Sequence, residues 1–285
     1  MGQTVIGVLH PGEMGSVVAA RAKEAGNRVL WTSEGRREET RRRAEAAGLE
    51  DAGSLRDLVA ASDVILSVCP PEAALDLARD VAATGFDRIY VDGNAVSPGT
   101  SRNIAEVIEG AGATFVDGGI IGPTPRKPGT TRLYASGPGA SQVKALFGDS
   151  ALSVIVLDAP AGAASAVKMA YASWTKGTSA LILSVRALAA IEGVEDALLA
   201  EWQISQPQLL KRVEDAAAGS APKAWRFVGE MEEIAATFAA AGLPDGFHLA
   251  AAEVWRRLSS YKDAPRPSVA DVVDVLTAAR PGSRP

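Results

Sequence analysis

The stretch Gly7-Val8-Leu9-His10-Pro11-Gly12-Glu13-Met14-Gly15 decides how this chain folds. The apolar run Thr4 to Leu9 predicts a buried strand, and the segment Met14 to Ala25 predicts a helix. Gly12 and Gly15 occupy the second and third glycine positions of the pattern G-x-G-x-x-G, and His10 stands at the first. Glycines at these positions permit a tight turn and close packing of the helix on the strand. The stretch therefore predicts a strand-turn-helix unit.

On the C-terminal side of this unit, short apolar runs alternate with amphipathic stretches, which is typical of βαβ units and a parallel sheet. The predicted strands are Thr4–Leu9, Arg28–Thr32, Val64–Val68, Ile89–Asp92 and Thr114–Asp117, followed by Leu133–Ser136 and Val154–Leu157. The predicted helices among them are Met14–Ala25, Glu38–Ala47, Ser54–Ala60 and Ser101–Gly110. This order predicts a Rossmann domain.

The pattern changes after Pro160. From Gly162 to Ile191 apolar residues recur at helical spacing, which predicts one helix near 45 Å long at roughly 1.5 Å per residue. Gly193 then suits a helix C-cap, and the remaining residues predict further helices. We expect an α/β Rossmann domain over residues 1–160 and an all-α domain over residues 161–285, joined by the long interdomain helix. The tail from Arg280 to Pro285 is expected to be disordered.

Composition narrows the class of protein. Of 285 residues, 47% are hydrophobic and 22% are charged, which is ordinary for a globular chain. The net charge of -5 gives no electrostatic reason to bind nucleic acid or an anionic membrane. Cys69 is the only cysteine, which excludes an intramolecular disulfide and a thiolate metal cage and favours a reducing cytoplasm. We expect no metal site, secretory signal or membrane span.

The first turn is a candidate cofactor site. A dinucleotide pyrophosphate is expected to rest on backbone N–H groups at the start of the first helix, beside His10, Pro11, Gly12, Glu13 and Met14. The alternative is a tight turn that serves packing alone. The second strand ends about twenty residues beyond Gly12, as a cofactor site requires.

The end of the second strand points to NADP(H). Ser33, Arg36 and Arg37 stand where NAD-binding chains place an acidic residue, and guanidinium groups suit a 2′-phosphate. The alternatives are a solvated helix start and a ribose held by Glu34. For the later arginines, Arg41 to Arg43, we expect surface pairing with Glu38 and Glu39.

Six ordered segments extend the comparison over nearly the whole chain. They are Gly12-Glu13-Met14-Gly15, Asp63 to Pro71, Asp92-Gly93-Asn94-Ala95-Val96-Ser97-Pro98, Asp117 to Pro123, Pro128-Gly129-Thr130-Thr131, and Gly162 to Lys168. Together they resemble the β-hydroxyacid dehydrogenase superfamily, which includes 3-hydroxyisobutyrate and 6-phosphogluconate dehydrogenases and, more distantly, imine reductases. The resemblance implies cofactor contacts from Cys69, Pro70 and Asn94, and substrate contacts from Ser97, Gly119, Ile120, Ile121 and Gly122. For Asn94 and Ser97 the alternative is a loop-capping role. It also implies a homodimer.

Within that resemblance, Lys168 matches the lysine that carries catalysis in the family. We expect it to give a proton to, or take one from, the substrate oxygen during hydride transfer. The alternative is a surface lysine on a long helix. Tyr171 lies three residues later on the same helix face, as a second proton donor or as a packing residue with a wet hydroxyl.

The departures concentrate at the substrate positions. Two family asparagines become Tyr171 and Ala172, a serine becomes Ile121, and a glycine becomes Pro123. The segment Trp225 to Glu233 replaces the customary K-D motif, which indicates a divergent branch.

Three functions are therefore weighed for this chain. The first is an NADP-dependent oxidoreductase acting on a hydroxyl or carbonyl group of a small, hydroxy acid-like substrate. The second is an imine reductase, against which the retained Lys168 argues, because the imine-reducing branch usually lacks that lysine. The third is a non-catalytic NADP-binding sensor or interaction module, which the fold alone does not exclude.

Overall fold

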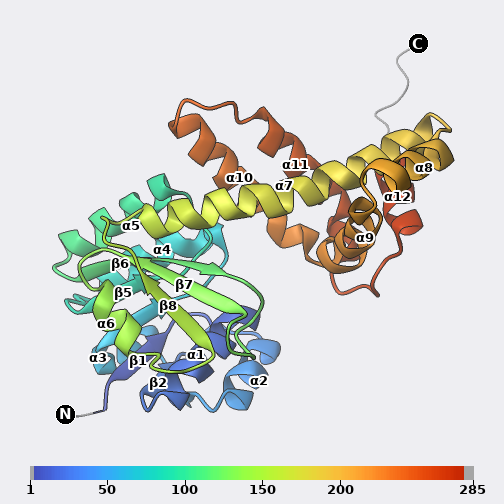
Figure 1. Cartoon of the computed structure of the whole chain (residues 1–285). Helices are drawn as coiled ribbons and strands as arrows, with labels where there is room; N and C mark the ends of the chain where they lie inside the picture. Colours follow the sequence, from blue (N-terminus) through green and yellow to red (C-terminus); the bar gives the residue numbers. More distant parts are fainter. Residues whose placement is uncertain (1–2, 279–285) are drawn as a thin grey trace. The chain divides into compact units, whose positions relative to one another are not determined.

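The computed structural model describes residues 3–278. The chain divides into two compact units, Met1–Met169 and Ala170–Pro285, each described here by itself (Figure 1). The sequence placed the boundary near residue 160, in the connection before the long helix, whereas the units divide within that helix. The expected disorder of Arg280–Pro285 lies outside the described residues.

The N-terminal unit contains an eight-stranded sheet with the strand order β3-β2-β1-β4-β5-β6-β7-β8. Its strands are β1 (Val5–Val8), β2 (Arg28–Trp31), β3 (Glu50–Asp51), β4 (Val64–Ser67), β5 (Ile89–Asp92), β6 (Thr114–Ile121), β7 (Thr131–Ser136) and β8 (Leu152–Val156). From β3 to β6 all neighbours are parallel, so their carboxyl ends share one edge of the sheet. The order reverses between β1 and β4, which is the switch point where doubly wound folds bind ligands.

The helices of this unit agree with the sequence where the apolar pattern is long. They are α1 (Glu13–Glu24), α2 (Glu38–Ala46), α3 (Leu55–Ala61), the short turn η1 (Pro71–Ala73), α4 (Ala74–Ala82), α5 (Pro98–Gly110) and α6 (Ala140–Ala145). The Rossmann prediction is confirmed. The sequence analysis missed β3, α4 and α6. In α4 the buried residues Ala74, Ala78 and Val81 follow helical spacing, but two of them are alanines and give a weak signal.

One strand runs against the expected direction. The sequence predicted a parallel sheet, but β7 pairs antiparallel with β6, with Gly119 opposite Tyr134. Residues 122–130 contain no helix to carry the chain back across the sheet, so the chain turns and pairs beside β6. In addition, β6 continues to Ile121, four residues beyond its predicted end at Asp117.

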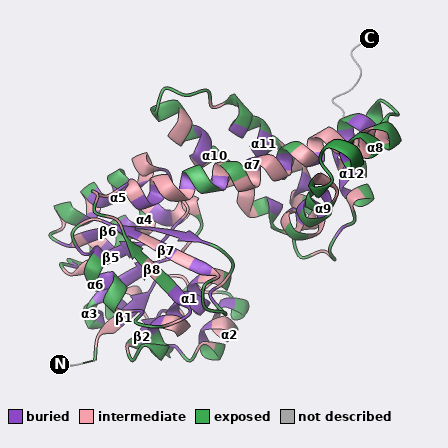
Figure 2. Ribbon diagram, viewed as in Figure 1, coloured by how far each residue is buried: buried purple, intermediate pink, exposed green. Residues whose placement is uncertain are grey.

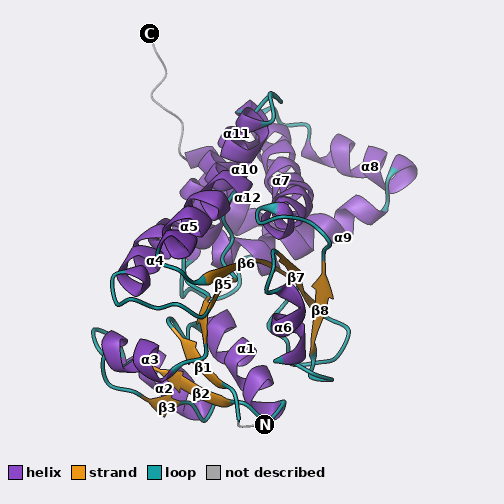
Figure 3. Cartoon of the chain, turned by 90° about the vertical axis from the view of Figure 1, so that its left-hand side faces the viewer, coloured by secondary structure: helices purple, strands orange, loops and turns teal. Residues whose placement is uncertain are grey.

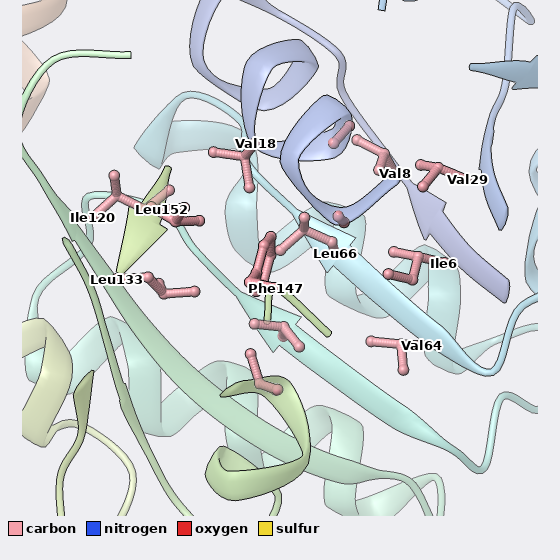
Figure 4. Close-up of a cluster of buried hydrophobic side chains, with 14 of the residues drawn as sticks. Ile6, Val8, Val18, Val29, Val64, Leu66, Ile120, Leu133, Phe147 and Leu152 are labelled. Carbon is pink, nitrogen blue, oxygen red and sulfur yellow. The ribbon is translucent and has the colours of Figure 1, made fainter. Parts of the chain in front are cut away.

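Two apolar layers cover the faces of the sheet. On one face, Ile6, Val8, Val29 and Leu66 pack with residues of α1, α2 and α6, together with Phe147 (Figure 4). On the other face, Leu30, Ile65, Tyr90 and Phe115 pack with α3, α4 and α5. Burial on both faces explains why the central strands read as continuous apolar runs rather than alternating ones.

The C-terminal unit contains helices and connecting loops but no strand among its described residues (Figure 3). The long helix α7 spans Ala163–Ile191, so it begins in the N-terminal unit and continues in this one. The other elements are α8 (Glu195–Ser205), α9 (Gln208–Asp215), the π-helical turn η2 (Ala216–Ser220), η3 (Ala221–Lys223), α10 (Ala224–Ala240), α11 (Gly246–Arg257), η4 (Leu258–Tyr261) and α12 (Val269–Ala278). Over residues 3–278, no helix is both long and apolar enough to cross a membrane.

The core of this second unit forms around Trp255, which is fully buried. The Phe227 ring meets its indole edge-on at 5.3 Å, and the Lys176 ammonium lies 4.9 Å from the centre of the Phe227 ring. Lys176 also pairs with Glu230 at 2.6 Å, where both side chains are largely buried. The Trp225–Glu233 segment, which replaces the family's K-D motif, therefore contributes to packing through α10.

Candidate functional site

The turn between β1 and α1 has the shape that a dinucleotide site requires. A Cβ atom on Gly15 would lie 2.4 Å from the carbonyl oxygen of His10, so only glycine fits where α1 begins. The Gly12 amide donates to the same carbonyl at 2.8 Å and closes the turn. Pro11 is buried, Glu13 is exposed and Met14 is half-buried. The residues present fit the pyrophosphate of a dinucleotide, which would meet the backbone N–H groups at the start of α1.

Arg36 lies against this turn rather than in open solvent. Its Nη2 donates to the Leu9 carbonyl oxygen at 2.8 Å, and its Nη1 lies 3.2 Å from Nδ1 of His10. Burial and the charge of Arg36 lower the pKa of His10. The structure therefore brings together the glycine turn and the end of β2, as the sequence predicted for a cofactor site.

The remaining predicted phosphate ligands occupy different positions. Ser33 is half-buried, and its amide donates to Asp51 at 3.1 Å. Arg37 precedes α2 and is exposed. The Glu34 carboxylate accepts from the Leu55 amide at 3.3 Å, which directs it toward the start of α3. Glu34 therefore has a helix-capping contact in the structure, and the ribose role considered from the sequence stays an alternative.

Arg41 does not follow the expectation of surface pairing. Arg43 pairs with Glu39 and Arg42 with Glu38, as expected. Arg41 instead turns back, and its Nη2 donates to the Ser33 carbonyl oxygen at 2.9 Å. This places a second guanidinium at the end of β2, five residues from Arg36. The sequence could have indicated this position of Arg41, because residue 41 follows residue 37 by one helical turn and so lies on the same side of the helix.

A buried polar cluster holds the ends of β4 and β5 together. Asn94 accepts from the Cys69 amide at 2.5 Å, and its amide nitrogen donates to Ser67 at 3.1 Å and to Asp92. Asn94 is thus engaged within the protein, and its predicted cofactor contact stays a prediction. Burial, followed by the charge of Asp92, raises the pKa of the Cys69 thiol to about 12, so the sulfur is a neutral thiol.

Two further predicted residues flank this cluster. Pro70 is exposed and directly precedes the short turn η1 before α4. Ser97 is buried and caps α5, with its Oγ accepting from the Thr100 amide at 3.1 Å. The alternative role considered for Ser97, a loop cap, therefore exists in the structure. Its predicted substrate contact stays a prediction.

Beyond the cluster, β6 extends past its neighbour. Asp117 stands opposite Asp92 in register, so Gly118 to Ile121 continue four residues beyond the end of β5. A Cβ on Gly119 would lie 2.6 Å from the Ala164 carbonyl oxygen and 3.0 Å from Cβ of Lys168. Gly119 therefore permits the first turns of α7 to touch the strand. At Gly122 φ is +120°, and an added Cβ would meet Thr130.

Asp117 anchors α7 to this strand. Its fully buried carboxylate accepts hydrogen bonds from the amides of Gly162 and Ser165 at 2.9 and 3.0 Å. It also accepts from three hydroxyl groups, those of Ser101 at 2.9 Å, Ser136 at 3.0 Å and Ser165 at 2.5 Å. A negative charge at a helix N-terminus is favourable, and the amides it accepts from are the ones that lack partners in the helix. Sequence reasoning had assigned Asp117 no role of its own.

Lys168 lies one turn further along α7, and its Nζ donates to the carbonyl oxygen of Ile120 at 2.8 Å. The side chain is half-buried. The predicted catalytic lysine and the predicted substrate segment Gly119 to Gly122 are therefore neighbours, at the carboxyl edge that also holds the glycine turn. Tyr171 lies three residues further along α7 with 47% of its surface exposed. In residues 3–278 no group of three or more His, Cys, Asp or Glu side chains is arranged to hold a metal ion.

The fold and the turn geometry define a protein with an NAD(P)-binding dehydrogenase-like fold. Residues 5–157 match the family described as the NAD binding domain of 6-phosphogluconate dehydrogenase, and the chain belongs to that family. Residues 189–258 match a second description, a domain of unknown function numbered 1932. The resemblance drawn from the sequence motifs is thereby confirmed.

Individual relatives agree with this assignment. An uncharacterized 28.5 kDa protein of Methanothermus fervidus is 34% identical over 196 residues, which are 68% of this chain and 74% of that protein. A conserved protein of unknown function, reported to resemble 3-hydroxyacid dehydrogenases, is 29% identical with a TM-score of 0.68, covering 90% of this chain and 97% of the other.

Structures with lower identity share the fold. The 3-hydroxyisobutyrate dehydrogenase of Mycobacterium tuberculosis has a TM-score of 0.70 at 18% identity, covering 96% of this chain and 99% of the other. Reductive aminases and imine reductases also share the fold, with lower TM-scores.

Proposed function

We propose that this chain is an NADP(H)-dependent oxidoreductase that transfers hydride between nicotinamide and a hydroxyl or carbonyl group of a small, hydroxy acid-like substrate. The observation that carries the proposal is the position of Lys168, whose ammonium group contacts Ile120 at the carboxyl edge of the sheet. The glycine turn at the end of β1 lies on the same edge. A proton-transfer group and a dinucleotide site on one edge are what hydride transfer to or from oxygen requires.

The cofactor, when bound, supplies or accepts the hydride. The turn residues His10 to Met14 would hold its pyrophosphate, and Arg36, Arg37 and Arg41 at the end of β2 would hold a 2′-phosphate. In the reducing direction, the Lys168 Nζ gives a proton to the substrate oxygen as the carbon receives hydride, and solvent returns a proton to the amine. In the oxidising direction, the neutral amine takes the hydroxyl proton.

The first experiment separates cofactor binding from chemistry. Fluorescence titration is expected to show tighter binding of NADPH than NADH, and the preference is expected to fall in the Arg36→Ala/Arg37→Ala variant. Lys168→Met is expected to keep NADPH affinity and to lose about 10²-fold to 10⁴-fold in turnover with carbonyl substrates. Lys144→Met, at an exposed position on α6, is the matched control and should retain turnover.

Two results would overturn the proposal. Absence of binding of both nucleotides would remove the oxidoreductase itself. Turnover that survives in Lys168→Met would remove the lysine as proton donor.

Imine reduction is the second candidate, and the exposed phenol of Tyr171 favours it, because a phenol can protonate nitrogen. A panel of carbonyl and imine compounds with NADPH distinguishes the two. Imine turnover that depends on Tyr171, tested as Tyr171→Phe, and that persists in Lys168→Met would support the second candidate. Cofactor binding without turnover of any compound would favour the non-catalytic sensor.

The homodimer is also a proposal, and an apolar stripe on α7 supports it. The stripe alternates three- and four-residue steps through Tyr171, Trp174, Thr178, Leu181, Val185 and Leu188. Of these, Trp174, Leu181 and Leu188 are 61%, 48% and 58% exposed. Figure 2 shows exposed as well as buried residues along α7. Such spacing is typical of a helix that packs along another helix. A depression of about 470 Å³ beside the stripe, lined in part by Trp202 and Leu209, offers room for partner side chains.

Light scattering tests the dimer directly. The measured mass of the wild-type chain is expected to be twice 29.4 kDa, and that of Leu181→Glu/Leu188→Glu is expected to be the mass of one chain. Ala200→Glu, at an exposed position on α8, serves as the control. A monomeric wild-type chain would refute the dimer without touching the cofactor assignment. The single cysteine, the half-buried Cys69, suits a reducing compartment such as the cytoplasm.

A further inference from the structure

His10 occupies the position where the dinucleotide fingerprint has its first glycine, and the binding turn does not require an imidazole there. The structure shows two contacts for the ring. Nδ1 lies 3.2 Å from Nη1 of Arg36, and Nε2 lies 3.4 Å from the point where Gly12 would carry a Cβ. One ring nitrogen therefore faces Arg36, while the other faces the turn that begins α1.

These contacts define the state of the ring in the free protein. A guanidinium group only donates hydrogen bonds, so Nδ1 accepts and the proton of the neutral imidazole is on Nε2. The charged groups around the ring are Arg36 from the β2–α2 connection and Arg43 from α2, while α1 brings Glu13 one residue beyond Gly12. Burial, Arg36 and Arg43 together lower the pKa of His10 and so favour the neutral imidazole.

We propose that His10 is a proton-linked ligand of the dinucleotide, which takes up a proton from solvent when the anionic cofactor binds. This inference rests on the cofactor site of the proposed function. Phosphate groups at the turn bring negative charge, which favours a cationic imidazole. They also attract Arg36, whose Nε is buried without a hydrogen-bond partner among the described residues and therefore gains from a phosphate acceptor.

The linkage has a definite sign. The pKa of His10 lies below its ordinary value in the free protein and rises in the complex, so binding takes up a proton at pH values between the two. The affinity for the cofactor therefore increases as the pH falls through this window. A plot of log Kd against pH has a positive slope there, and the slope does not exceed one. The 2′-phosphate has a pKa near 6 and gives up its proton on binding to arginine, which acts in the opposite direction.

The chain has only two histidines, so the proton can be followed at a single residue. NMR of protein labelled in its histidine rings gives the pKa of His10 and of His248 with and without NADP⁺, which is stable in acid. Calorimetric titration of NADP⁺ in buffers of different ionisation enthalpy counts the protons taken up per site. The variants are His10→Gln, which still accepts from Arg36 but does not titrate, and His248→Gln in the other unit as the control.

We expect the His10 signal to titrate at higher pH in the complex and the His248 signal to stay in place. Proton uptake in wild type should exceed that in His10→Gln by a fraction of a proton, at most one per site, and His248→Gln should match wild type. If NADP⁺ binds while the His10 signal and the proton count do not change, the inference is overturned and the proposed function stands. If NADP⁺ does not bind at all, the proposed function fails together with it.

Discussion

Replacement of Asp117 is expected to damage the N-terminal unit more than any surface change of similar size. Asp117→Ala removes one buried carboxylate and leaves five donors without their acceptor, two of them backbone amides at the start of α7. The three hydroxyl groups can rotate to other acceptors, but the two amides cannot move without unwinding the helix. A buried donor left unsatisfied costs about 1–3 kcal/mol, so the two amides together cost about 2–6 kcal/mol.

Urea unfolding followed by circular dichroism measures this loss. With a denaturant slope of about 2–3 kcal/mol per molar, a loss of about 4 kcal/mol moves the midpoint down by roughly 1–2 M. Asp117→Asn should fall between wild type and Asp117→Ala, because the amide oxygen still accepts while its NH₂ group faces other donors. Asp149→Ala, an exposed carboxylate before β8, is the control and should stay within about 0.5 kcal/mol.

Hydrogen exchange localises the effect to the start of α7. A loss of about 4 kcal/mol corresponds to exchange about a thousandfold faster for the amides of residues 162–168, if these open in the same event. If Asp117→Ala had the same exchange rates and the same urea midpoint as Asp149→Ala, the Asp117 carboxylate would not anchor the helix.

Three further predictions, two for substitutions and one for a reaction, each depend on a single local feature of the structure. Gly119→Ala should destabilise the N-terminal unit by about 1–3 kcal/mol in urea unfolding, because its Cβ would lie 2.6 Å from the Ala164 carbonyl oxygen. Gly110→Ala, with open space around the added methyl group, should be neutral or stabilising, and a similar loss at both sites would contradict the packing argument. The Cys69 thiol, with its pKa raised to about 12, should react with a disulfide reagent at pH 8 about a thousandfold more slowly in the native chain than in urea; equal rates would show an accessible thiolate. Arg41→Met should weaken NADP⁺ binding about tenfold in a fluorescence titration and leave NAD⁺ binding unchanged, whereas Arg42→Met at an exposed position should change neither.

The sequence predicted the fold because its apolar runs and turn residues are strong local signals. Strand β5 and helix α7 begin and end within a residue of their predicted bounds, since continuous apolar runs and helical spacing leave little choice. The predicted direction of β7 was wrong. The direction of a strand depends on whether a crossover helix precedes it, and here none does, so the residues of the strand itself do not reveal it. The helices α4 and α6 were missed because they are short and their buried faces are made largely of small residues.

The candidate site was predictable where a motif determines the backbone conformation. It was less predictable where a long side chain has several possible hydrogen-bond partners. The glycine turn and the lysine near the substrate segment follow from spacing, and the structure brings both to one edge. The contact of Arg41 with Ser33, like that of Arg36 with Leu9, depends on where long side chains turn in three dimensions. The role of Asp117 depends on residues up to 48 positions away, which no local pattern reveals.

The contacts that anchor α7 also determine when the N-terminal unit becomes stable during synthesis. All eight strands have been made once Val156 leaves the ribosome, but the buried carboxylate of Asp117 still lacks both of its backbone donors until residues 162–165 follow. At about 5–20 residues per second, that interval lasts roughly 0.5–2 seconds, with the Asp117 carboxylate only partly satisfied. We therefore expect the N-terminal unit to reach its final stability only when the helix that opens the next unit has begun to form. A fragment that ends at Pro160 should unfold more easily than one that ends after Met169.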